Sequence, residues 1–148
     1  MNGQGIAAAL ALGAQAAQLG TAFLTCDESG ISTIYRNALL DPNRGATRHT
    51  RAFTGRWARG LENRFIVEMA SKETAILPFP AQNIFTQDIR RKATQAGLPD
   101  YLSLWAGQGV SLIRPMTAKA LVETLLKETF EAVSRADSHL RQVEPTDR

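Results

Sequence analysis

The first 24 residues restrict the possible folds of this chain more than any other stretch. Small and apolar residues recur there at positions that share one face of a helix: Ile6, Ala9, Leu10 and Gly13. This spacing predicts a helix that packs closely against a neighbouring element. Gly13 ends the pattern, where helices commonly finish on a residue in the left-handed conformation. We therefore expect a small-residue helix that stops at Gly13.

A short apolar run and a glycine–threonine pair follow this helix. Ala16, Ala17 and Leu19 predict a parallel strand that is covered on both faces. Gly20 has no Cβ and lets a ligand approach the backbone, while Thr21 offers an amide, a hydroxyl and a helix N-cap. A helix, a strand and a phosphate-binding turn in this order are typical of the last unit of a (β/α)8 barrel. Because such a barrel usually takes ~250 residues and this chain has 148, we expect the chain to hold a minor part of one.

The region after the turn is predicted to be mostly helical. Asp27 or Ser29 is expected to cap a helix whose apolar residues share one face, namely Ile31, Ile34, Tyr35, Ala38 and Leu39. Asp41-Pro42-Asn43 ends this helix, residues 43–47 form a loop, and residues 50–54 form a short strand closed by Gly55. A second amphipathic helix follows, and its buried face carries Leu61, Phe65, Ile66 and Met69.

The C-terminal half continues the helical pattern after a rigid connection at Pro78-Phe79-Pro80. Thr86 caps a helix that Gly97 stops, and the residues directed inward are Ile89, Ala93 and Ala96. Residues 101–105 form a short helix or turn. Thr117 caps the last helix, which frays from Ser134 onward. The apolar face of that helix consists of Leu121, Leu125, Phe130 and Val133.

Cysteine content and hydropathy exclude several classes of protein. The single cysteine, Cys26, cannot form an internal disulfide. No Lys or Arg precedes Arg36, so the basic region of a secretory signal peptide is absent. No apolar run reaches the ~20 residues that are needed to cross a bilayer. We expect a cytoplasmic protein with no membrane partner.

Arginines are concentrated between residues 36 and 64, and this basic segment has two interpretations. It includes Arg36, Arg44, Arg48, Arg51, Arg56, Arg59 and Arg64. Such a segment can hold a phosphate or lie along a nucleic acid. It can equally form a solvated face or pair with carboxylates of a missing segment. We favour the second interpretation and expect no nucleic-acid partner, because no aromatic residues interleave with the arginines as a base-stacking platform requires.

Five segments of the chain follow one another in a characteristic order and spacing. They are GIAAALALGAQAAQLGTAF (5–23), SGISTIYRNALL (29–40), TRAFTGRWARGLENRF (50–65), PFPAQNIFT (78–86) and PDYLSLWAGQG (99–109). Together they resemble the nitronate monooxygenase family, formerly called 2-nitropropane dioxygenases. The resemblance runs from about Gly3 to Glu128. It implies an α/β fold, the C-terminal portion of a (β/α)8 barrel joined to a mostly helical added domain.

The same resemblance implies an FMN-dependent oxidoreductase that oxidises alkyl nitronates with O2 to a carbonyl compound and nitrite. In that family the turn that wraps the FMN phosphate matches Gln18, Leu19, Gly20 and Thr21 here. The alternative is that Gly20-Thr21 only ends a strand and caps a helix. The implied divisions are the end of the FMN-binding barrel (1–40), a mostly helical region covering the substrate (41–110), a C-terminal helix (111–135) and a flexible tail (136–148).

The sequence also departs from the family pattern. A Gly-Gly-Ile turn that cradles the phosphate would precede Met1, and Asn2-Gly3-Gln4 stand where the family usually has Asp-Gly followed by arginine. The family's catalytic histidine lies in its N-terminal half, so we assign no catalytic residue to this chain. We expect an N-terminally truncated chain that is inactive by itself. The alternative function is a non-catalytic interaction fragment that docks on a missing barrel half or forms a homo-oligomer.

Three further side chains invite a chemical role, and a structural interpretation is favoured for each. His49 lies among arginines and His139 lies in the polar C-terminal part, and neither has a carboxylate and a nucleophile beside it. We interpret both as exposed histidines. Cys26 is either a reactive thiol or a small buried hydrophobic residue, and we favour the latter. Without a second cysteine or clustered histidines, no metal site is expected.

For residues in two loops, the sequence is compatible with either ligand binding or a structural role. Trp105, Gln108 and Gly109 suit a loop that brings a ring and an amide toward a flat ligand, or else a packed core residue and a turn. Gln82 and Asn83 are polar residues between apolar ones. They either line the substrate cavity or bridge backbone groups.

Overall fold

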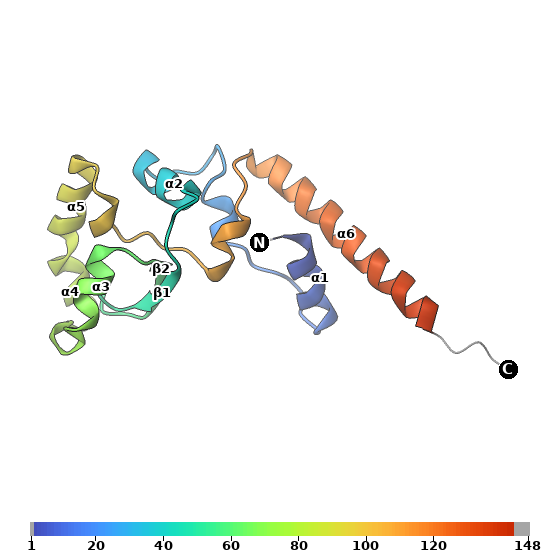
Figure 1. Ribbon diagram of the computed structural model, residues 1–148, viewed down its shortest axis with the longest axis horizontal. Helices are drawn as coiled ribbons and strands as arrows, with labels where there is room; N and C mark the ends of the chain where they lie inside the picture. Colours follow the sequence, from blue (N-terminus) through green and yellow to red (C-terminus); the bar gives the residue numbers. More distant parts are fainter. Residues whose placement is uncertain (1, 144–148) are drawn as a thin grey trace.

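The computed structural model describes residues 2–143 of the chain. Its elements are the α-helices α1 (Gly3–Ala11), α2 (Thr33–Leu40), α3 (Arg64–Ala70), α4 (Ala81–Phe85), α5 (Gln87–Ala96) and α6 (Ala118–Val143), the strands β1 (Thr47–Thr50) and β2 (Ala58–Leu61), and the 3-10 helices η1 (Thr21–Phe23), η2 (Glu73–Ala75), η3 (Pro99–Tyr101) and η4 (Gln108–Leu112). Figure 1 shows an elongated arrangement with α1 beside the long helix α6 at one end. The two strands lie with α3, α4 and α5 at the other end, and α2 lies between the two groups.

Helices α1 and α6 are joined by a partly buried polar contact. The backbone amide of Gly3 donates a hydrogen bond of 2.8 Å to the Glu128 carboxylate. Arg114 donates to both oxygens of the same carboxylate, at 2.5 and 3.2 Å. The hydrogen bond from Arg114, aided by the Gly3 amide, lowers the pKa of Glu128 below its ordinary value. A Cβ on Gly3 would lie 2.3 Å from Cβ of Glu128, so this close approach requires glycine.

The small sheet is extended by a third segment. Strands β1 and β2 pair antiparallel, with Thr47 opposite Leu61 and Thr50 opposite Ala58. On its other edge β2 contacts residues 104–106. The Leu61 amide donates to the Leu104 carbonyl at 2.9 Å, and the Ala106 amide donates to the Arg59 carbonyl at 3.0 Å. Gly60 permits this approach, because a Cβ there would lie 2.8 Å from the Leu104 carbonyl oxygen.

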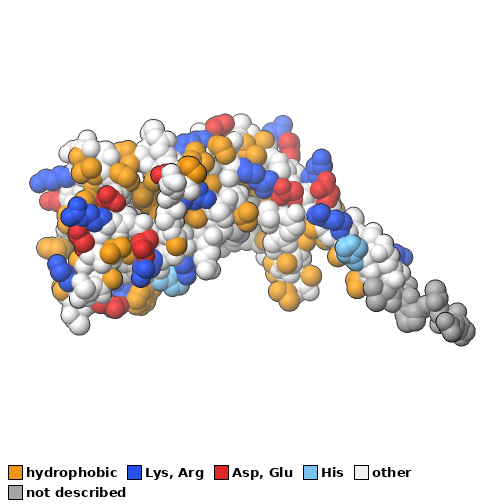
Figure 2. Space-filling model, viewed as in Figure 1, with side chains coloured by type: hydrophobic (Ala, Val, Ile, Leu, Met, Phe, Trp, Pro, Cys, Tyr) orange, Lys and Arg blue, Asp and Glu red, His pale blue; other side chains and the backbone are white. Residues whose placement is uncertain are grey.

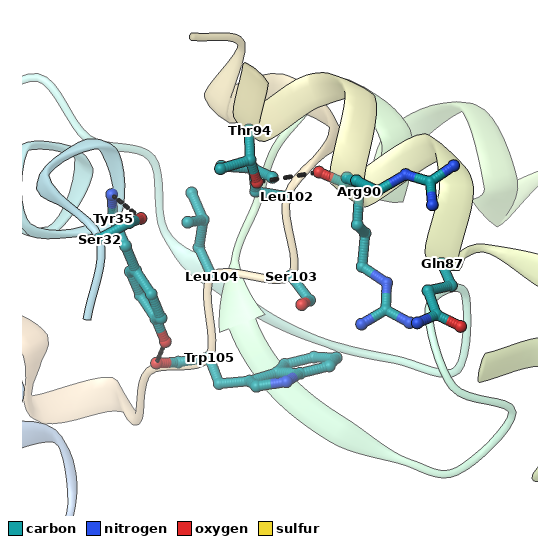
Figure 3. A pocket seen from close by; sticks show the side chains of 10 residues that line it. Ser32, Tyr35, Gln87, Arg90, Thr94, Leu102, Ser103, Leu104 and Trp105 are labelled. Atoms are coloured by element: carbon teal, nitrogen blue, oxygen red, sulfur yellow. Dashed lines mark hydrogen bonds between the residues drawn. The ribbon is translucent and has the colours of Figure 1, made fainter. Parts of the chain in front are cut away.

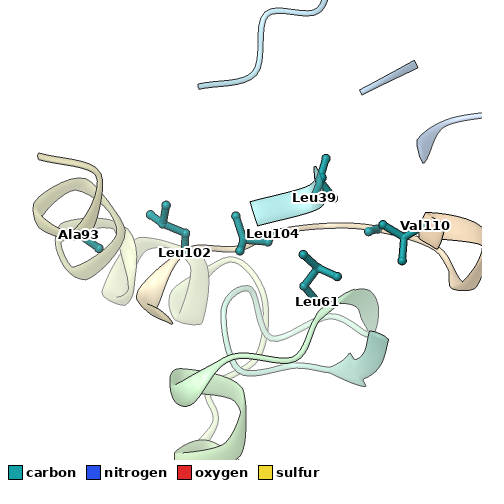
Figure 4. Close-up of a cluster of buried hydrophobic side chains, with 7 residues drawn as sticks. Leu39, Leu61, Ala93, Leu102, Leu104 and Val110 are labelled. Atoms are coloured by element: carbon teal, nitrogen blue, oxygen red, sulfur yellow. The ribbon is translucent and has the colours of Figure 1, made fainter. Parts of the chain in front are cut away.

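Apolar side chains form three clusters along the molecule. One joins α2, β2, α5 and the 102–110 segment through Leu39, Leu61, Ala93, Leu102, Leu104, Ala106 and Val110 (Figure 4). The second consists of Ala52, Phe53, Phe65 and Ile66, with the Phe53 and Phe65 rings 4.7 Å apart. The third consists of Ala22, Cys26, Leu121 and Leu125, which attach η1 and the residues after it to α6. No helix in the described range 2–143 combines the length and apolar character needed to cross a bilayer.

Several helix boundaries confirm the sequence predictions. Gly13, at a φ of 93°, follows the end of α1, and Gly97, at a φ of 71°, closes α5. Asp41 ends α2. The Thr117 hydroxyl accepts a hydrogen bond of 3.2 Å from the Ala120 amide and caps α6.

The strand predicted from Ala16 to Leu19 was wrong for this structure. Residues 15–19 have no regular secondary structure, and their amides donate no hydrogen bond to any described residue. A strand exists only where a neighbour completes its ladder, and the described chain supplies none. The predicted cap of α2 was also wrong. Ser32 caps α2 by accepting from the Tyr35 amide at 3.3 Å, whereas Ser29 and Asp27 bond to Ile31 and Arg36.

Boundaries in the middle of the chain also differ from those predicted. The strand expected over 50–54 is β1 at Thr47–Thr50, because the Thr50 hydroxyl accepts from the Ala52 amide and turns the chain there. Strand β2 was missed, and Leu61 belongs to it rather than to α3. On α5 Ala93 is buried, but Ile89 and Ala96 are exposed.

The predicted cap at Thr21 was wrong, Thr86 occupies the predicted N-cap position of α5 but makes no side-chain capping bond, and the last helix is longer than expected. Thr21 is the first residue of η1 and makes no capping bond, while the Thr86 hydroxyl bonds to the Phe53 carbonyl at 2.6 Å. Helix α6 continues beyond Ser134 and through the predicted tail as far as Val143. Residues 144–148, including Pro145, lie outside the described part of the chain.

Replacing Gly3 with alanine is expected to separate α1 from α6. The new Cβ would meet Cβ of Glu128 and the backbone amide of Thr129 at 2.3 Å. Urea unfolding followed by circular dichroism should show a loss of about 1–3 kcal/mol in the free energy of unfolding. Gly5→Ala, on the same helix, is the matched control, because a Cβ there meets only the Asn2 side chain at 3.5 Å. Equal stability of the two variants would contradict this account of the α1–α6 contact.

Candidate functional site

The predicted phosphate turn, Gln18 to Thr21, lies between two anchored segments. Helix α1 precedes it and is fixed to α6 through Gly3. After the turn, Ala22 and Cys26 are buried against Leu121 and Leu125 of α6. Gln18 and Gly20 are exposed, and Leu19 and Thr21 are half-buried. The turn is therefore held at both ends while its backbone faces outward.

The amides of this turn are unpaired within the described chain. The backbone N–H groups of residues 18–22 donate to no described acceptor, although Ala22 is only 1% exposed. A buried amide without a partner, as at Ala22, is rare in folded proteins, and successive free amides suit an anion. A Cβ built on Gly20 would meet nothing within 4 Å, so the space beside this residue is open. These observations fit a group with several acceptor oxygens, such as a phosphate.

The Thr21 hydroxyl connects the turn to a loop 86 residues away. It accepts a hydrogen bond of 2.9 Å from the Gly107 amide. A threonine hydroxyl that accepts one bond still has its own hydrogen to donate. Residues 107–109 therefore lie next to the turn. The sequence singled out Gln108 and Gly109, but not the Gly107 amide that makes the contact.

The position of the 107–109 loop is fixed by the residues just before it, because residues 104–106 pair with β2. Trp105 is part of the fold rather than a free ring, because its indole lies edge-on to Phe53 at 5.8 Å and its carbonyl accepts from the Tyr35 hydroxyl. Burial raises the pKa of Tyr35 to about 12, so this hydroxyl stays protonated as a donor. Gln108, by contrast, is exposed. Packing therefore applies to the side of Trp105 that meets Phe53, while the residue also borders a hollow with Leu104.

The other polar candidates have structural roles. Gln82 is buried and bridges backbone groups, accepting from the Leu77 amide and donating to the Ala52 carbonyl. The oxygens of Asn83 accept from Arg90. His49 on β1 and His139 on α6 are both exposed.

Cys26 is a buried hydrophobic residue, as predicted. It is 2% exposed, and burial raises the pKa of its thiol, which disfavours the reactive thiolate. Among the described residues no group of three or more His, Cys, Asp or Glu side chains is placed to hold a metal ion.

The arginines of the basic segment find partners within the chain. Arg36 pairs with Asp27, Arg48 with Glu62 and Arg64 with Glu68. Three arginines lie over aromatic rings, although we expected no aromatic residues to interleave with the segment: Arg51 over Trp57, Arg56 over Phe79 and Arg64 over Tyr101. The carboxylates that pair with Arg36, Arg48 and Arg64 thus belong to this chain and not to a missing segment, as one of our alternatives had it.

Two hollows flank the turn. One of about 340 Å³ is lined by Asn2, Gly5, Ile6, Ala9, Ala17, Gln18, Leu19 and Leu112. The other, of about 430 Å³, is the α1–α6 groove, lined almost entirely by apolar side chains: Ile6, Leu10, Leu19, Phe23, Val122, Leu125, Leu126, Thr129, Phe130 and Val133. Figure 2 shows hydrophobic side chains gathered on the protruding end of α1 beside this groove. Leu19 borders both hollows, so the turn stands at the edge of an exposed apolar face.

Comparisons with known proteins show which family the chain resembles. The sequence profile described as nitronate monooxygenase matches residues 1–128. A probable nitronate monooxygenase of Staphylococcus saprophyticus is 40% identical over 135 residues, which are 91% of this chain and 38% of that protein. One from Bacillus subtilis is 41% identical over 86% of this chain and 37% of its own length. The chain therefore spans less than two fifths of the length of these curated relatives.

Solved structures match the fold of the chain. The nitroalkane oxidase of Streptomyces ansochromogenes superposes with a TM-score of 0.85 at 46% identity, over 92% of this chain and 39% of the other. FabK of Thermotoga maritima superposes with a TM-score of 0.75 at 29% identity, over 93% of this chain and 44% of the other. These matches confirm the expected fold class, a portion of a (β/α)8 barrel with a mostly helical addition.

Thr21→Val should loosen the contact between the turn and the 107–109 loop. Valine has the shape of threonine but leaves the Gly107 amide without its acceptor. Thermal and urea unfolding should show a loss of about 1–2 kcal/mol in the free energy of unfolding. Thr21→Ser, which keeps the hydroxyl, is the control and should retain most of that stability. A valine variant as stable as the serine variant would show that this hydrogen bond does not hold the loop.

Proposed function

The chain belongs to the nitronate monooxygenase family, and we propose that it supplies the FMN phosphate turn of an oxidoreductase that converts alkyl nitronates and O2 to carbonyl compounds and nitrite. The observation that carries this proposal is the run of unpaired amides from Gln18 to Ala22 beside the Thr21 hydroxyl. When bound, FMN supplies the redox chemistry by taking electrons from the nitronate and passing them to O2. The contribution of this chain's own residues is to bind the FMN phosphate and so to orient the cofactor.

Each residue of the turn has a separate task in this proposal. The amides of Leu19, Gly20 and Thr21 donate to phosphate oxygens, and the Thr21 hydroxyl adds a further donor while it holds the Gly107 amide. Gly20 keeps the space beside the backbone clear. Gln18 begins the turn, and its exposed side chain borders the hollow of about 340 Å³. A dianionic phosphate offers enough acceptor positions for all of these donors.

We assign no catalytic group to the described residues. His49 lies on β1 and His139 lies far along α6, and Cys26 is buried with a raised thiol pKa. We propose that residues 1–40 bind the cofactor, that residues 41–110 cover the substrate, and that helix α6 supports both. Turnover then requires the part of the family's length that this chain does not span, and the chain by itself is inactive toward nitronates.

An FMN titration of the 148-residue chain, followed by flavin fluorescence, tests the turn. Saturable binding is expected, and Gly20→Val and Thr21→Ala should each weaken it by about tenfold or more, because the first fills the open space and the second removes a donor. A Cβ at Gly20 meets no described atom within 4 Å, so Gly20→Val is expected to fold normally. Gly30→Val is the matched control, since a Cβ at Gly30 also meets open space, away from the turn. If the Gly20 and Gly30 variants bind FMN equally well, the assignment of the turn is wrong.

A second candidate function is that of an interaction module, which the exposed apolar face favours. The α1–α6 groove exposes large side chains, with Phe130 72% and Leu126 55% exposed. The unpaired amides of residues 15–19 lie next to it through Leu19. An unpaired backbone edge beside an apolar face is a surface on which another polypeptide adds a strand and covers the groove. The occupant we propose is the part of the family fold that this chain does not match.

Analytical ultracentrifugation of the chain mixed with the unmatched portion of the Streptomyces ansochromogenes enzyme tests this interaction. We expect a one-to-one complex, which Leu126→Glu weakens by about tenfold or more because it places a charge in the groove. Lys127→Glu is the control, since Lys127 is an exposed neighbour that does not line the groove. A well-folded chain that stays monomeric in the mixture would exclude the interaction, and nitrite release by the chain alone would refute its dependence on a partner.

A further inference from the structure

We propose that a hollow between α2 and α5, remote in sequence from the phosphate turn, binds a small planar organic anion, either a carboxylate or a nitronate. This Arg90 hollow is defined by Tyr35, Arg90, Arg91, Ser103, Leu104 and Trp105, and it encloses about 460 Å³ (Figure 3). That volume falls within the range of small-ligand sites. None of residues 18–21 lines it, so this inference does not depend on the proposed cofactor turn.

Arg90 brings an uncompensated positive charge to the hollow. Its Nη2 donates to the backbone and side-chain oxygens of Asn83 at 2.8 and 2.9 Å. Within residues 2–143 it has no carboxylate at ion-pair distance, its Nη1 has no hydrogen-bond partner, and its Nε is buried and unpaired. Burial lowers the pKa of Arg90, as expected for a cation without a counter-ion, yet a guanidinium remains charged. No Asp or Glu lines the hollow, so nothing there competes with an incoming anion.

The rest of the lining suits a ligand with a planar charged head and an apolar body. Leu104 is 4% exposed and forms an apolar wall with Leu102 and the Trp105 indole. Figure 3 shows the Arg90 guanidinium and the Ser103 side chain directed toward the space above that indole. The Ser103 hydroxyl has no partner in the described chain, so it is available to donate. A planar two-oxygen anion matches the parallel N–H groups of a guanidinium, and its carbon part then rests on the indole.

The same features argue against a phosphate as the ligand. Arg91 also lines the hollow, but it pairs with Asp88 at 2.8 Å, which leaves Arg90 as the one described lining cation without a carboxylate partner. A single such cation balances a monoanion better than a dianion. Carboxylates and nitronates share this planar two-oxygen group, and the experiment separates them.

Tryptophan fluorescence provides the measurement. The chain has two tryptophans, and Trp57 lies outside the hollow, so Trp57→Phe leaves Trp105 as the reporter. Benzoate and propane 2-nitronate are titrated as the two candidate anions, with neutral benzamide and inorganic phosphate as comparisons. We expect saturable quenching by at least one planar anion and none by benzamide. The tighter of the two anions identifies the ligand class.

Substitutions on α5 decide whether the signal comes from Arg90. Arg90→Met should raise the dissociation constant by about tenfold or more, because it removes a charged donor. Gln87→Glu places a carboxylate one turn from Arg90 at an exposed position, and it should raise the constant about fivefold without harming the fold. Gln95→Glu makes the same change outside the hollow and is the control.

Circular dichroism confirms that each variant is folded, and Gln87→Glu keeps the test valid if Arg90→Met does not fold. Absence of saturable quenching, equal effects of Gln87→Glu and Gln95→Glu, or tighter binding of phosphate than of either planar anion would each overturn the proposal. FMN binding is measured on the same variants. Loss of anion binding in Gln87→Glu with FMN binding intact would show that the two sites are separate.

Discussion

One carboxylate joins α1 to α6 and fixes one side of the turn that we propose to bind phosphate. Glu128 accepts the Gly3 amide and the Arg114 guanidinium, groups that are more than one hundred residues apart in sequence. Removing one partner of such a part-buried pair leaves the other charge without compensation, so the three groups act together. With α1 fixed at one side and η1 packed on α6 at the other, the intervening residues have little freedom. The unpaired amides are therefore presented by a scaffold rather than by a free loop.

A second constraint brings the other half of the molecule to the same place. Residues 104–106 pair with β2, and this short contact depends on the absence of a Cβ at Gly60. The pairing delivers the Gly107 amide to the Thr21 hydroxyl. The β1–β2 sheet and the turn after α1 are thus linked by hydrogen bonds through residues 104–107, although they share no secondary structure. A cofactor held at the turn would lie beside the 107–109 loop.

The sequence predicted what depends on local signals and missed what depends on distant partners. Gly13, Asp41, Gly97 and Thr117 mark helix ends in the structure because caps and left-handed glycines act over a few residues. Residues 16–19 did not form a strand, since a strand needs a neighbour that the described chain lacks. The Thr21–Gly107 bond and the Arg90 hollow join segments about 50 to 90 residues apart. No spacing rule in a single sequence encodes such contacts.

The two ends of the molecule differ in how many of their polar groups have a hydrogen-bond or ion-pair partner. Around β1, β2 and α3 the arginines have carboxylates or rings beside them, and Gln82 satisfies backbone groups in the interior. Around α1 and α6 the amides of residues 15–22 have no described acceptor, and large apolar side chains such as Phe130 face outward. Buried polar groups and broad apolar faces are costly to leave without partners. The polar groups named around β1, β2 and α3 are therefore satisfied within the chain, whereas those around α1 and α6 leave room for the cofactor and the further polypeptide that we propose.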